Sequence, residues 1–307
     1  MDVPLQCRRL SFSRFGGPGA ITGMGSGQWP ALEDAVAALV RAERTLSRFD
    51  PNSELSRLDR GELQDLAPLA AEALRAALAM AAWTDGLVTP LVGGALRRAG
   101  YDRSFETIDF AVERSLAPAA PAPDWRSIDV TVDGDVRLPP EPGLDLAGTA
   151  KGFLADRVVR GFSPETPVLL EFDGVFAANG PRLDGAPWLL PVTAPGSHRP
   201  VGFVALARGG VATSAPARRR WFRGGRSVHH LIDPRTGEPV VTDVSSATVV
   251  APSALLAQAA AKVVCLAGAD AGLAFLAVHA ELSGVVVRDD GSVVVVGDPA
   301  QELVRAA

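Results

Sequence analysis

The sequence contains few of the residues that build disulfide frameworks and metal clusters. Its 307 residues include only two cysteines, Cys7 and Cys265, and four histidines. The cysteines are far apart, and Cys265 belongs to an apolar, helix-like run, so we expect two free thiols. Neither a disulfide scaffold nor a cysteine-based metal site is predicted.

Long apolar runs and an excess of positive charge are also missing. No window approaches the length of a membrane span, and the N-terminal residues MDVPLQCRRLSF place no apolar segment before Cys7. Neither secretion nor a lipid-anchored cysteine is therefore predicted, and we expect a cytoplasmic protein without a membrane segment. The net charge of −5 gives no general attraction to nucleic acid.

What is present is typical of a globular protein. Hydrophobic residues make up 47% of the chain, enough for the core of one large domain or of two intimate lobes. Apolar residues recur at helical spacing over 30–46, 62–83 and 253–266, with a short helical turn at 53–58. A Pro/Ala-rich stretch at 116–124 is predicted to be an exposed connection.

Strand signals outnumber helix signals. Residues 1–28 contain short β-like pieces broken by glycines, and hairpins are predicted over 128–138 and 285–296. Further strands are predicted at 167–172, 187–193, 201–207, 209–214, 227–232 and 244–250. A few long helices with recurring hairpins predict an α+β fold with largely antiparallel sheets.

The stretch from Val211 to Val240 is the richest in chemistry. It carries a run of arginines, a Gly224-Gly225 turn, and His229 beside His230. Neighbouring side chains on a strand point to opposite faces, so one histidine of the pair is expected to face a cleft as a general base near neutral pH. A structural histidine and an ordinary Asp-Pro-x-Thr-Gly turn are the alternative interpretation.

A second stretch, Asp145 to Gly152, places small residues and Lys151 before a predicted helix. Small residues let backbone amides approach a ligand, a helix N-terminus favours phosphate, and lysine adds a point charge. The glycine spacing and the Lys-Ser/Thr pair of a P-loop are absent. Close helix packing is the alternative explanation for the small residues.

Four stretches in order resemble the ApbE family of FAD:protein FMN transferases. They are FDPxSELSRL at 49–58, DLxGxAKG at 145–152, VATS at 211–214 with HxIDPRTG at 230–237, and VSSxTV at 244–249 followed by APS at 251–253. The resemblance implies one ApbE-like, T-fold-like flavin transferase domain over residues 1–307.

Members of that family bind FAD with Mg²⁺ at the pyrophosphate and transfer FMN to a Thr or Ser hydroxyl of a partner protein, releasing AMP. Such chemistry needs charge neutralisation at the pyrophosphate and a base for the hydroxyl proton. The resemblance therefore implies FAD as substrate and an acceptor protein as partner, and the net charge of −5 predicts no nucleic-acid partner.

The resemblance also assigns roles to single residues. FAD contacts are implied for Phe15, Phe49, Thr89, Pro90, Leu91, Asp145, Lys151 and Ile232. The carbonyl of Gly148 matches a backbone metal ligand. His230 matches the histidine that activates the acceptor hydroxyl, and Asp233 follows it as the second candidate catalytic residue.

The sequence departs from the family where the metal ligands are expected. Gln258 and Lys262 stand in place of an Asp and a Thr or Ser, on one face of the 253–266 helix. Gln is a weaker Mg²⁺ ligand than a carboxylate, and protonated Lys cannot bind a cation. We hypothesise that the Lys262 ammonium replaces the metal as an FAD contact; the alternative is that Lys262 points to solvent.

Two smaller departures accompany this one. Asp173-Gly174-Val175 replaces a Gly-Gly-Asp segment, and Asp59 replaces an Asn. Three functions stay open from the sequence: FMN transfer to a protein, FAD binding without transfer, and FAD pyrophosphatase activity.

Overall fold

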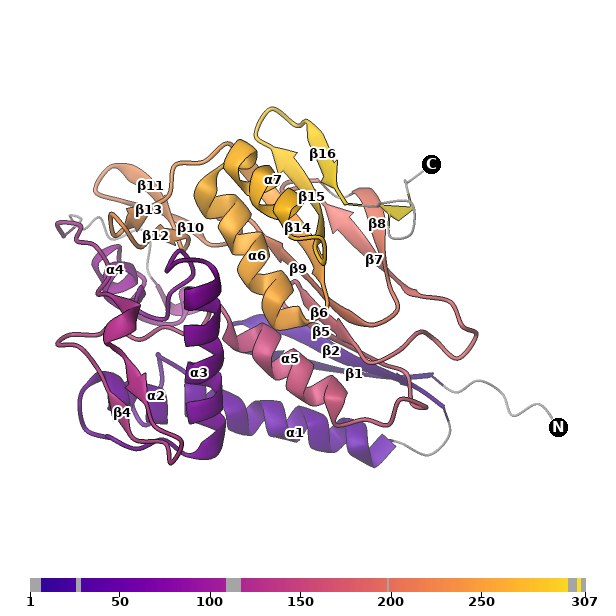
Figure 1. The fold of residues 1–307 in the computed structure, drawn as a ribbon, viewed down its shortest axis with the longest axis horizontal. Coiled ribbons are helices and arrows are strands. Elements are labelled where there is room, and N and C mark those ends of the chain that lie inside the picture. The colour runs from indigo at the N-terminus through magenta and orange to yellow at the C-terminus, as the bar shows by residue number, and fades with distance from the viewer. Residues whose placement is uncertain (1–6, 26–28, 109–116, 198, 298–302, 305–307) are drawn as a thin grey trace. The chain divides into compact units, whose positions relative to one another are not determined.

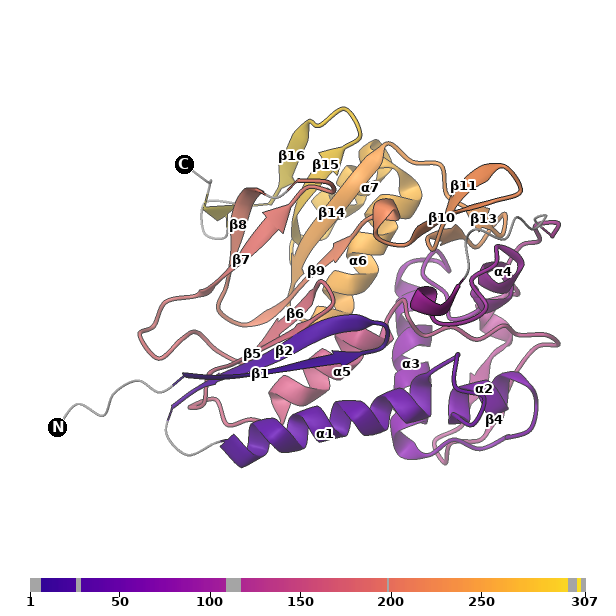
Figure 2. The same ribbon diagram turned by 180° about the vertical axis from the view of Figure 1, so that it is seen from behind.

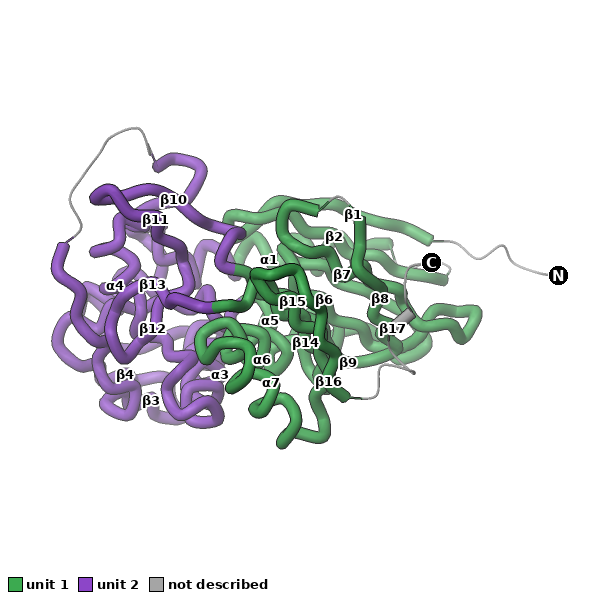
Figure 3. Tube along the Cα trace, turned by 90° about the horizontal axis from the view of Figure 1, so that it is seen from above, with its two compact units in different colours: residues 1–41, 151–215, 243–307 green, residues 42–150, 216–242 purple. Residues whose placement is uncertain are grey.

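The computed structural model describes residues 7–25, 29–108, 117–197, 199–297 and 303–304. They form two compact units (Figure 3). The first unit comprises Met1–Arg41, Lys151–Ala215 and Asp243–Ala307, and the second comprises Ala42–Ala150 and Pro216–Thr242. In the part of the chain so described, no helix is both long and apolar enough to cross a bilayer.

The first unit is built on an eight-stranded sheet in which every neighbouring pair is antiparallel. The strand order is β1 (Cys7–Arg14), β2 (Gly17–Met24), β5 (Val168–Phe172), β6 (Val175–Ala178), β9 (Gly209–Ser214), β14 (Val244–Ala251), β15 (Ser283–Arg288) and β16 (Val293–Val296).

A smaller sheet and a helical layer cover opposite faces of this sheet (Figures 1 and 2). The smaller sheet has the order β17 (Leu303–Val304), β8 (Pro200–Leu206) and β7 (Trp188–Thr193). Along β9, Val211 joins the core shared with β7 and β8, whereas Gly210 on the other face abuts Ala254. The absent side chain of Gly210 lets a helix lie against the strands there.

That helix is α6 (Ala254–Ala267), followed by α7 (Ala269–Val278). α6 is rich in buried alanines, which allow close approach to β9 and β14. It begins at Ser253, whose side chain accepts a hydrogen bond from the Leu256 amide, and ends at Gly268 with φ 85°. The chain also forms α1 (Trp29–Leu46) and α5 (Ala150–Arg160).

The second unit has short elements around an aromatic core. Its helices are α2 (Glu54–Asp59), α3 (Pro68–Trp83), α4 (Gly93–Arg98), η1 (Phe105–Thr107), η2 (Trp125–Ser127) and η3 (Pro216–Arg218). Its two-stranded sheets pair β3 (Asp129–Val130) with β4 (Val136–Arg137), β10 (Arg220–Arg223) with β11 (Arg226–His229), and β12 (Ile232–Asp233) with β13 (Glu238–Pro239). Tyr101, Trp221 and Ile232 lie in its core.

The predicted fold class is confirmed, with two corrections to the predicted elements. The helix predicted over 62–83 begins only at Pro68, because proline is favoured in the first turn, where its missing N–H costs nothing. The strand predicted over 227–232 is two strands, with β11 ending at His229 and β12 beginning at Ile232. His229 and His230 therefore do not alternate within one strand. The exposed connection is confirmed over 117–124; residues 109–116 lie outside the described part.

Candidate functional site

Lys151 in the first unit forms a buried ion pair with Asp173. Their side chains are only 8% and 6% exposed. Asp173 lies in the two-residue turn between β5 and β6, with φ 52°, and Gly174 follows with φ 84°. This left-handed conformation is one that Asp tolerates better than most residues. The displaced carboxylate noted in the sequence is thus the partner of the lysine predicted to hold FAD.

Phe15 and Lys151 meet on the same aromatic side chain. The Lys151 Nζ lies 5.7 Å from the Phe172 ring centroid, and the Phe15 ring lies 5.6 Å from the same ring in an edge-on arrangement. Phe15 occupies the turn between β1 and β2, with φ 51°. Because β2 pairs with β5, both turns lie at one end of the large sheet, and the Asp173 amide donates to the Pro18 carbonyl at 2.9 Å.

The first turn of α5 packs tightly on α6. The Gly152 amide donates to the side-chain carbonyl Oε1 of Gln258 at 2.8 Å, in a buried position. A Cβ added at Gly152 would lie 2.6 Å from both the Ala254 carbonyl oxygen and the Leu255 Cα. Glycine at 152 therefore serves helix packing, the alternative that the sequence left open.

Backbone amides around the start of α5 are engaged by the protein itself. The Thr149 and Ala150 amides donate to the Leu146 carbonyl at 2.9 and 2.7 Å, and the Ala147 amide donates to Asp145 Oδ1 at 2.6 Å. Together with the Gly152 bond, these contacts favour charged side chains over the amides of this stretch as phosphate ligands.

The N-terminus of α6 is likewise occupied. The Asp156 carboxylate on α5 accepts hydrogen bonds from the Ala254 and Leu255 amides at 2.8 and 3.0 Å. Burial raises the pKa of Asp156, and the two amides act in the opposite direction. The sequence offered no signal for this long-range cap, which fixes the helix that carries Gln258 and Lys262.

Lys262 lies one turn beyond Gln258 on the same face of α6 and is half-buried. The chain contains 30 basic Lys and Arg residues, and only Lys151 and Lys262 among them are lysines. Both belong to the first unit. The two predicted FAD positions thus carry the compact ammonium group of lysine, whereas every other basic Lys or Arg position of the chain carries a guanidinium group.

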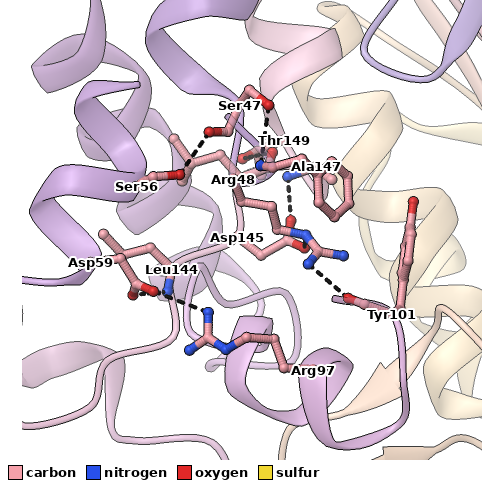
Figure 4. A network of polar contacts seen from close by, with 12 residues as sticks. Ser47, Arg48, Ser56, Asp59, Arg97, Tyr101, Leu144, Asp145, Ala147 and Thr149 are labelled. Atoms are coloured by element: carbon pink, nitrogen blue, oxygen red, sulfur yellow. Dashed lines mark hydrogen bonds and ion pairs between the residues drawn. The ribbon is translucent and has the colours of Figure 1, made fainter. Parts of the chain in front are cut away.

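In the second unit, Arg48 contacts two predicted residues, Asp145 and Phe49, and Figure 4 shows it beside Asp145 and Tyr101. Its Nε lies 2.8 Å from Asp145 Oδ2, and the two side chains are only 9% and 3% exposed. The guanidinium carbon lies 4.0 Å from the Phe49 ring centroid and 4.5 Å from that of Tyr101, the only tyrosine. The Asp145 amide donates to the Pro90 carbonyl at 2.8 Å. Arg48 was not predicted from sequence, although it directly precedes Phe49.

Asp59 contacts the segment that precedes Asp145 (Figure 4). Its carboxylate accepts the Leu144 amide at 2.6 Å and pairs with Arg97 at 3.0 Å. A pocket of about 450 Å³ lies beside it, lined by Arg48, Leu55, Ser56, Asp59, Arg60, Arg97, Glu141, Pro142, Gly143 and Leu144. The Asp59 departure from the family therefore serves to anchor the segment that leads to Asp145.

Thr89 and Leu91 are buried, and the Leu91 amide donates to the Thr89 hydroxyl at 3.3 Å. Ile232 is 4% exposed and belongs to the aromatic core. These three side chains therefore support the fold of the second unit. Gly148, the predicted backbone metal ligand, is half-exposed.

The two adjacent histidines differ in burial. His229 is buried; its Nδ1 accepts the Leu231 amide at 3.3 Å, so its Nε2 carries the proton and donates to the Val240 carbonyl at 3.0 Å. Burial lowers the pKa of His229. His230 is half-exposed, and its Nδ1 lies 3.4 Å from the Arg219 carbonyl oxygen. The structural role falls to His229, and His230 is the better candidate for a general base.

Asp233 shapes the turn that follows His230. Its carboxylate pairs with Arg235 at 2.8 Å, and this bond holds the pKa of Asp233 below its ordinary value. Its backbone carbonyl accepts the Gly237 amide at 2.8 Å. The Ala122 amide, from the exposed connection, donates to the Pro234 carbonyl at 2.8 Å. Asp233 is therefore engaged in holding its segment.

The side chains at the predicted metal position do not fit Mg²⁺. This ion prefers carboxylate oxygens, yet Gln258 is neutral and its Oε1 already accepts the Gly152 amide, and Lys262 is a cation. Within the residues that the structure describes, no cluster of three or more His, Cys, Asp or Glu side chains is arranged to hold a metal. These side chains favour the Lys262 ammonium group over a metal ion as the positive charge at this position.

The chain is similar to known proteins over most of its length. The ApbE family model matches residues 13–286. An FAD:protein FMN transferase of Haemophilus influenzae is 26% identical over 245 residues, 73% of this chain and 69% of that protein. One of Rhodobacter capsulatus is 30% identical over 244 residues, 76% of this chain but only 45% of that protein. The ApbE protein of Thermotoga maritima shares the fold, with a TM-score of 0.83 and 22% identity over 96% of this chain and 98% of that one.

Proposed function

This chain belongs to the ApbE family, and we propose that it transfers FMN from FAD to a hydroxyl of a partner protein, releasing AMP. The match over residues 13–286 carries this proposal, because it spans both units. The name FAD:protein FMN transferase, borne by the Haemophilus and Rhodobacter relatives, supports it.

In the proposed reaction, the half-exposed His230 takes the proton from a Thr or Ser hydroxyl of the acceptor. The hydroxyl oxygen forms a bond to the FMN phosphorus, the bond to the bridging pyrophosphate oxygen breaks, and AMP leaves with that oxygen. Asp233, held by Arg235, keeps the His230 segment in position. His229 is reserved for structure because both of its ring nitrogens are bonded.

We propose that the Lys151 and Lys262 ammonium groups bind the pyrophosphate; because Asp173 compensates the charge of Lys151, Lys262 supplies the net positive charge. Lys151 is positioned by Asp173, and Lys262 stands where the family resemblance implies a metal ligand. A cation adjacent to the leaving phosphate stabilises the negative charge that develops there. Mg²⁺ has this role in metal-dependent phosphoryl transfer. We propose that this site works without a metal, because Gln258 is neutral and its Oε1 accepts the Gly152 amide while Lys262 is a cation.

The remaining predicted residues are proposed to shape the FAD site. Phe49 offers an aromatic face for adenine, and its stacking on Arg48 fixes that face. Phe15 is proposed to contact FAD from the β1–β2 turn. Asp145 and Pro90 hold their loop. The Gly148 carbonyl, which the resemblance implies as a metal ligand, is proposed to lie near the FAD phosphates as an acceptor for a cation and not as a phosphate contact. Thr89, Leu91 and Ile232 act as support beneath these contacts.

The test is to incubate the protein with FAD and synthetic peptides that each contain one Thr or Ser, in EDTA and in Mg²⁺. AMP release together with flavin fluorescence on a peptide is expected, at equal rates in both conditions. FAD binding without AMP would indicate a flavin-binding protein, and AMP without a flavinylated peptide would indicate a pyrophosphatase.

Two variants sharpen this test. His230→Ala is expected to lose about 100-fold or more of the transfer rate while still binding FAD; His279→Ala, on α7's C-cap, is the matched control. Gln258→Asp combined with Lys262→Thr is expected to make transfer dependent on Mg²⁺. Equal rates in EDTA and Mg²⁺ for this double variant would contradict the lysine-for-metal proposal.

A further inference from the structure

We propose that the β10–β11 hairpin is the surface on which the acceptor protein docks, and that it selects an acidic segment beside the modified hydroxyl. This inference rests on the proposed transferase function. It concerns two residues of β10 in the second unit that the chemistry above does not use, Arg220 and Phe222.

Positive charge is concentrated at the hairpin. Five arginines fall within residues 218–226, although the whole chain has a net charge of −5. Arg218, Arg220 and Arg226 are exposed. Arg226 approaches Glu238 only to 3.7 Å, with both side chains largely in water, so this pairing is weak. The exposed Arg220 and Arg226 guanidinium groups are therefore accessible to a carboxylate partner.

The hairpin also exposes a large aromatic side chain. Trp221 and Val228 point inward, where they are 4% and 2% exposed, and the Trp221 Nε1 donates to the Ala99 carbonyl at 2.9 Å. Phe222 points to the opposite face, opposite Ser227, and is 71% exposed; Arg220, two residues earlier, shares that face, whereas Arg226, the cross-strand partner of Arg223, lies on the Trp221 face beside the turn. Exposed aromatic and arginine side chains together are enriched at protein interfaces, where they contribute most of the binding energy.

The backbone of the hairpin is defined by a tight turn and a buried anchor. Gly224 and Gly225 both have positive φ, 56° and 69°, and Arg223 pairs with Arg226 across them. Two positive-φ residues in a two-residue loop form the type I′ turn whose twist matches a β-hairpin. With Trp221 anchored in the core, little conformational entropy is lost on docking.

The hairpin leads directly to the proposed base. Ser227, the cross-strand partner of Phe222, is followed three residues later by His230, a separation of roughly 10 Å along an extended chain. An acceptor segment lying on Phe222 would thus present a hydroxyl to His230 only a few residues from its acidic positions. Charge complementarity then favours Asp or Glu close to the acceptor Thr or Ser.

The test uses two synthetic peptides with one Thr each, identical except that Asp and Glu in the first are Asn and Gln in the second. The wild-type protein is expected to flavinylate the acidic peptide with a kcat/KM at least tenfold higher, and this preference is expected to shrink as NaCl is raised. The combined variant Arg220→Gln and Phe222→Ser is expected to raise KM for the acidic peptide at least tenfold, with FAD affinity within twofold of wild type.

The controls remove an exposed arginine and an exposed apolar side chain elsewhere, Arg208→Gln and Val278→Ser, and are expected to behave as wild type. Fluorescence anisotropy of the labelled acidic peptide measures docking independently of transfer. Equal kcat/KM for the two peptides, or an unchanged KM in the hairpin variant, would overturn the docking proposal while leaving transferase function intact. The docking proposal would also be overturned if the wild-type protein bound phosphatidylglycerol vesicles, the hairpin variant did not, and neither protein preferred the acidic peptide. Absence of both AMP and flavinylated peptide would remove the function and the docking surface together.

Discussion

The Gly152 amide and the Gln258 side chain are joined by a buried hydrogen bond of 2.8 Å that ties the first turn of α5 to α6. The residue at the position where a metal ligand was expected therefore acts as a link between two helices. The same two helices carry Lys151 and Lys262. This hydrogen bond therefore helps to fix the positions of both ammonium groups within the first unit.

Replacing Gln258 by Ala is expected to destabilise the protein. The change leaves the Gly152 N–H buried without its acceptor, which costs about 1–3 kcal/mol. The free energy of unfolding, measured in urea, should fall by that amount. Gln64→Ala, at an exposed side chain, is the control and should change stability by less than about 0.5 kcal/mol. An unchanged midpoint for Gln258→Ala would show that this bond contributes nothing.

The Lys151–Asp173 pair is expected to respond asymmetrically to substitution. Lys151→Met or Asp173→Asn alone leaves a buried charge without its partner, which destabilises by about 3–5 kcal/mol. The double variant removes both charges and should recover much of that loss. Asn also tolerates the positive φ at position 173, so backbone strain is not the cause. Additive losses in a double-mutant cycle of unfolding free energies would refute the coupling; the exposed Arg182–Asp184 pair supplies the reference cycle.

His229 is expected to make stability fall on mild acidification. Its pKa is lowered in the folded state, so between the unfolded value, about 6.5, and the lower folded value the unfolded chain binds more protons. Its contribution to stability is complete above about pH 6.5 and is lost as pH falls below that, by at most about 1.4 kcal/mol per pH unit. Urea unfolding from pH 7.5 to 5.0 measures the slope. His229→Gln should flatten it, and the control His279→Gln should retain the His229 contribution.

The two thiols are expected to differ sharply in reactivity. Both cysteines are free, as the sequence predicted, but Cys7 is exposed and Cys265 is buried. Burial raises the pKa of Cys265 to about 12, so almost no thiolate forms at pH 8. A thiol reagent should therefore modify one cysteine in the native protein and the second only after unfolding. Rapid labelling of both in native buffer would contradict the packing around α6.

Local patterns accounted for most elements of the fold. Periodicity at 2 and 3.6 residues depends on near neighbours in the chain, so α1, α6, the β15–β16 hairpin and the antiparallel class were readable directly. Errors arose where local signals conflicted. Apolar periodicity extended the second helix upstream of Pro68, and a β-like composition hid the break after His229, where side-chain bonds interrupt the strand.

The candidate site was predicted only as a set of separate stretches. Motif letters singled out Lys151, Asp145 and His230. Asp173 was noted as a departure from the family but not as the partner of Lys151, and Arg48, the partner of Asp145, carries no recognisable local signal. Arg48 lies 97 positions from Asp145, and Asp156 lies 98 positions from the Ala254 amide that it caps.

By itself, the amino-acid sequence determined which helices and hairpins form and which family motifs the chain carries, because these depend on residues within a few positions of one another. Only the tertiary structure decided that Gln258 binds a backbone amide, that Asp173 holds Lys151, and that His229 is structural while His230 stays accessible. Burial and pairing depend on segments that are distant along the chain and adjacent in space, and a buried charge or amide is stable only where folding supplies its partner.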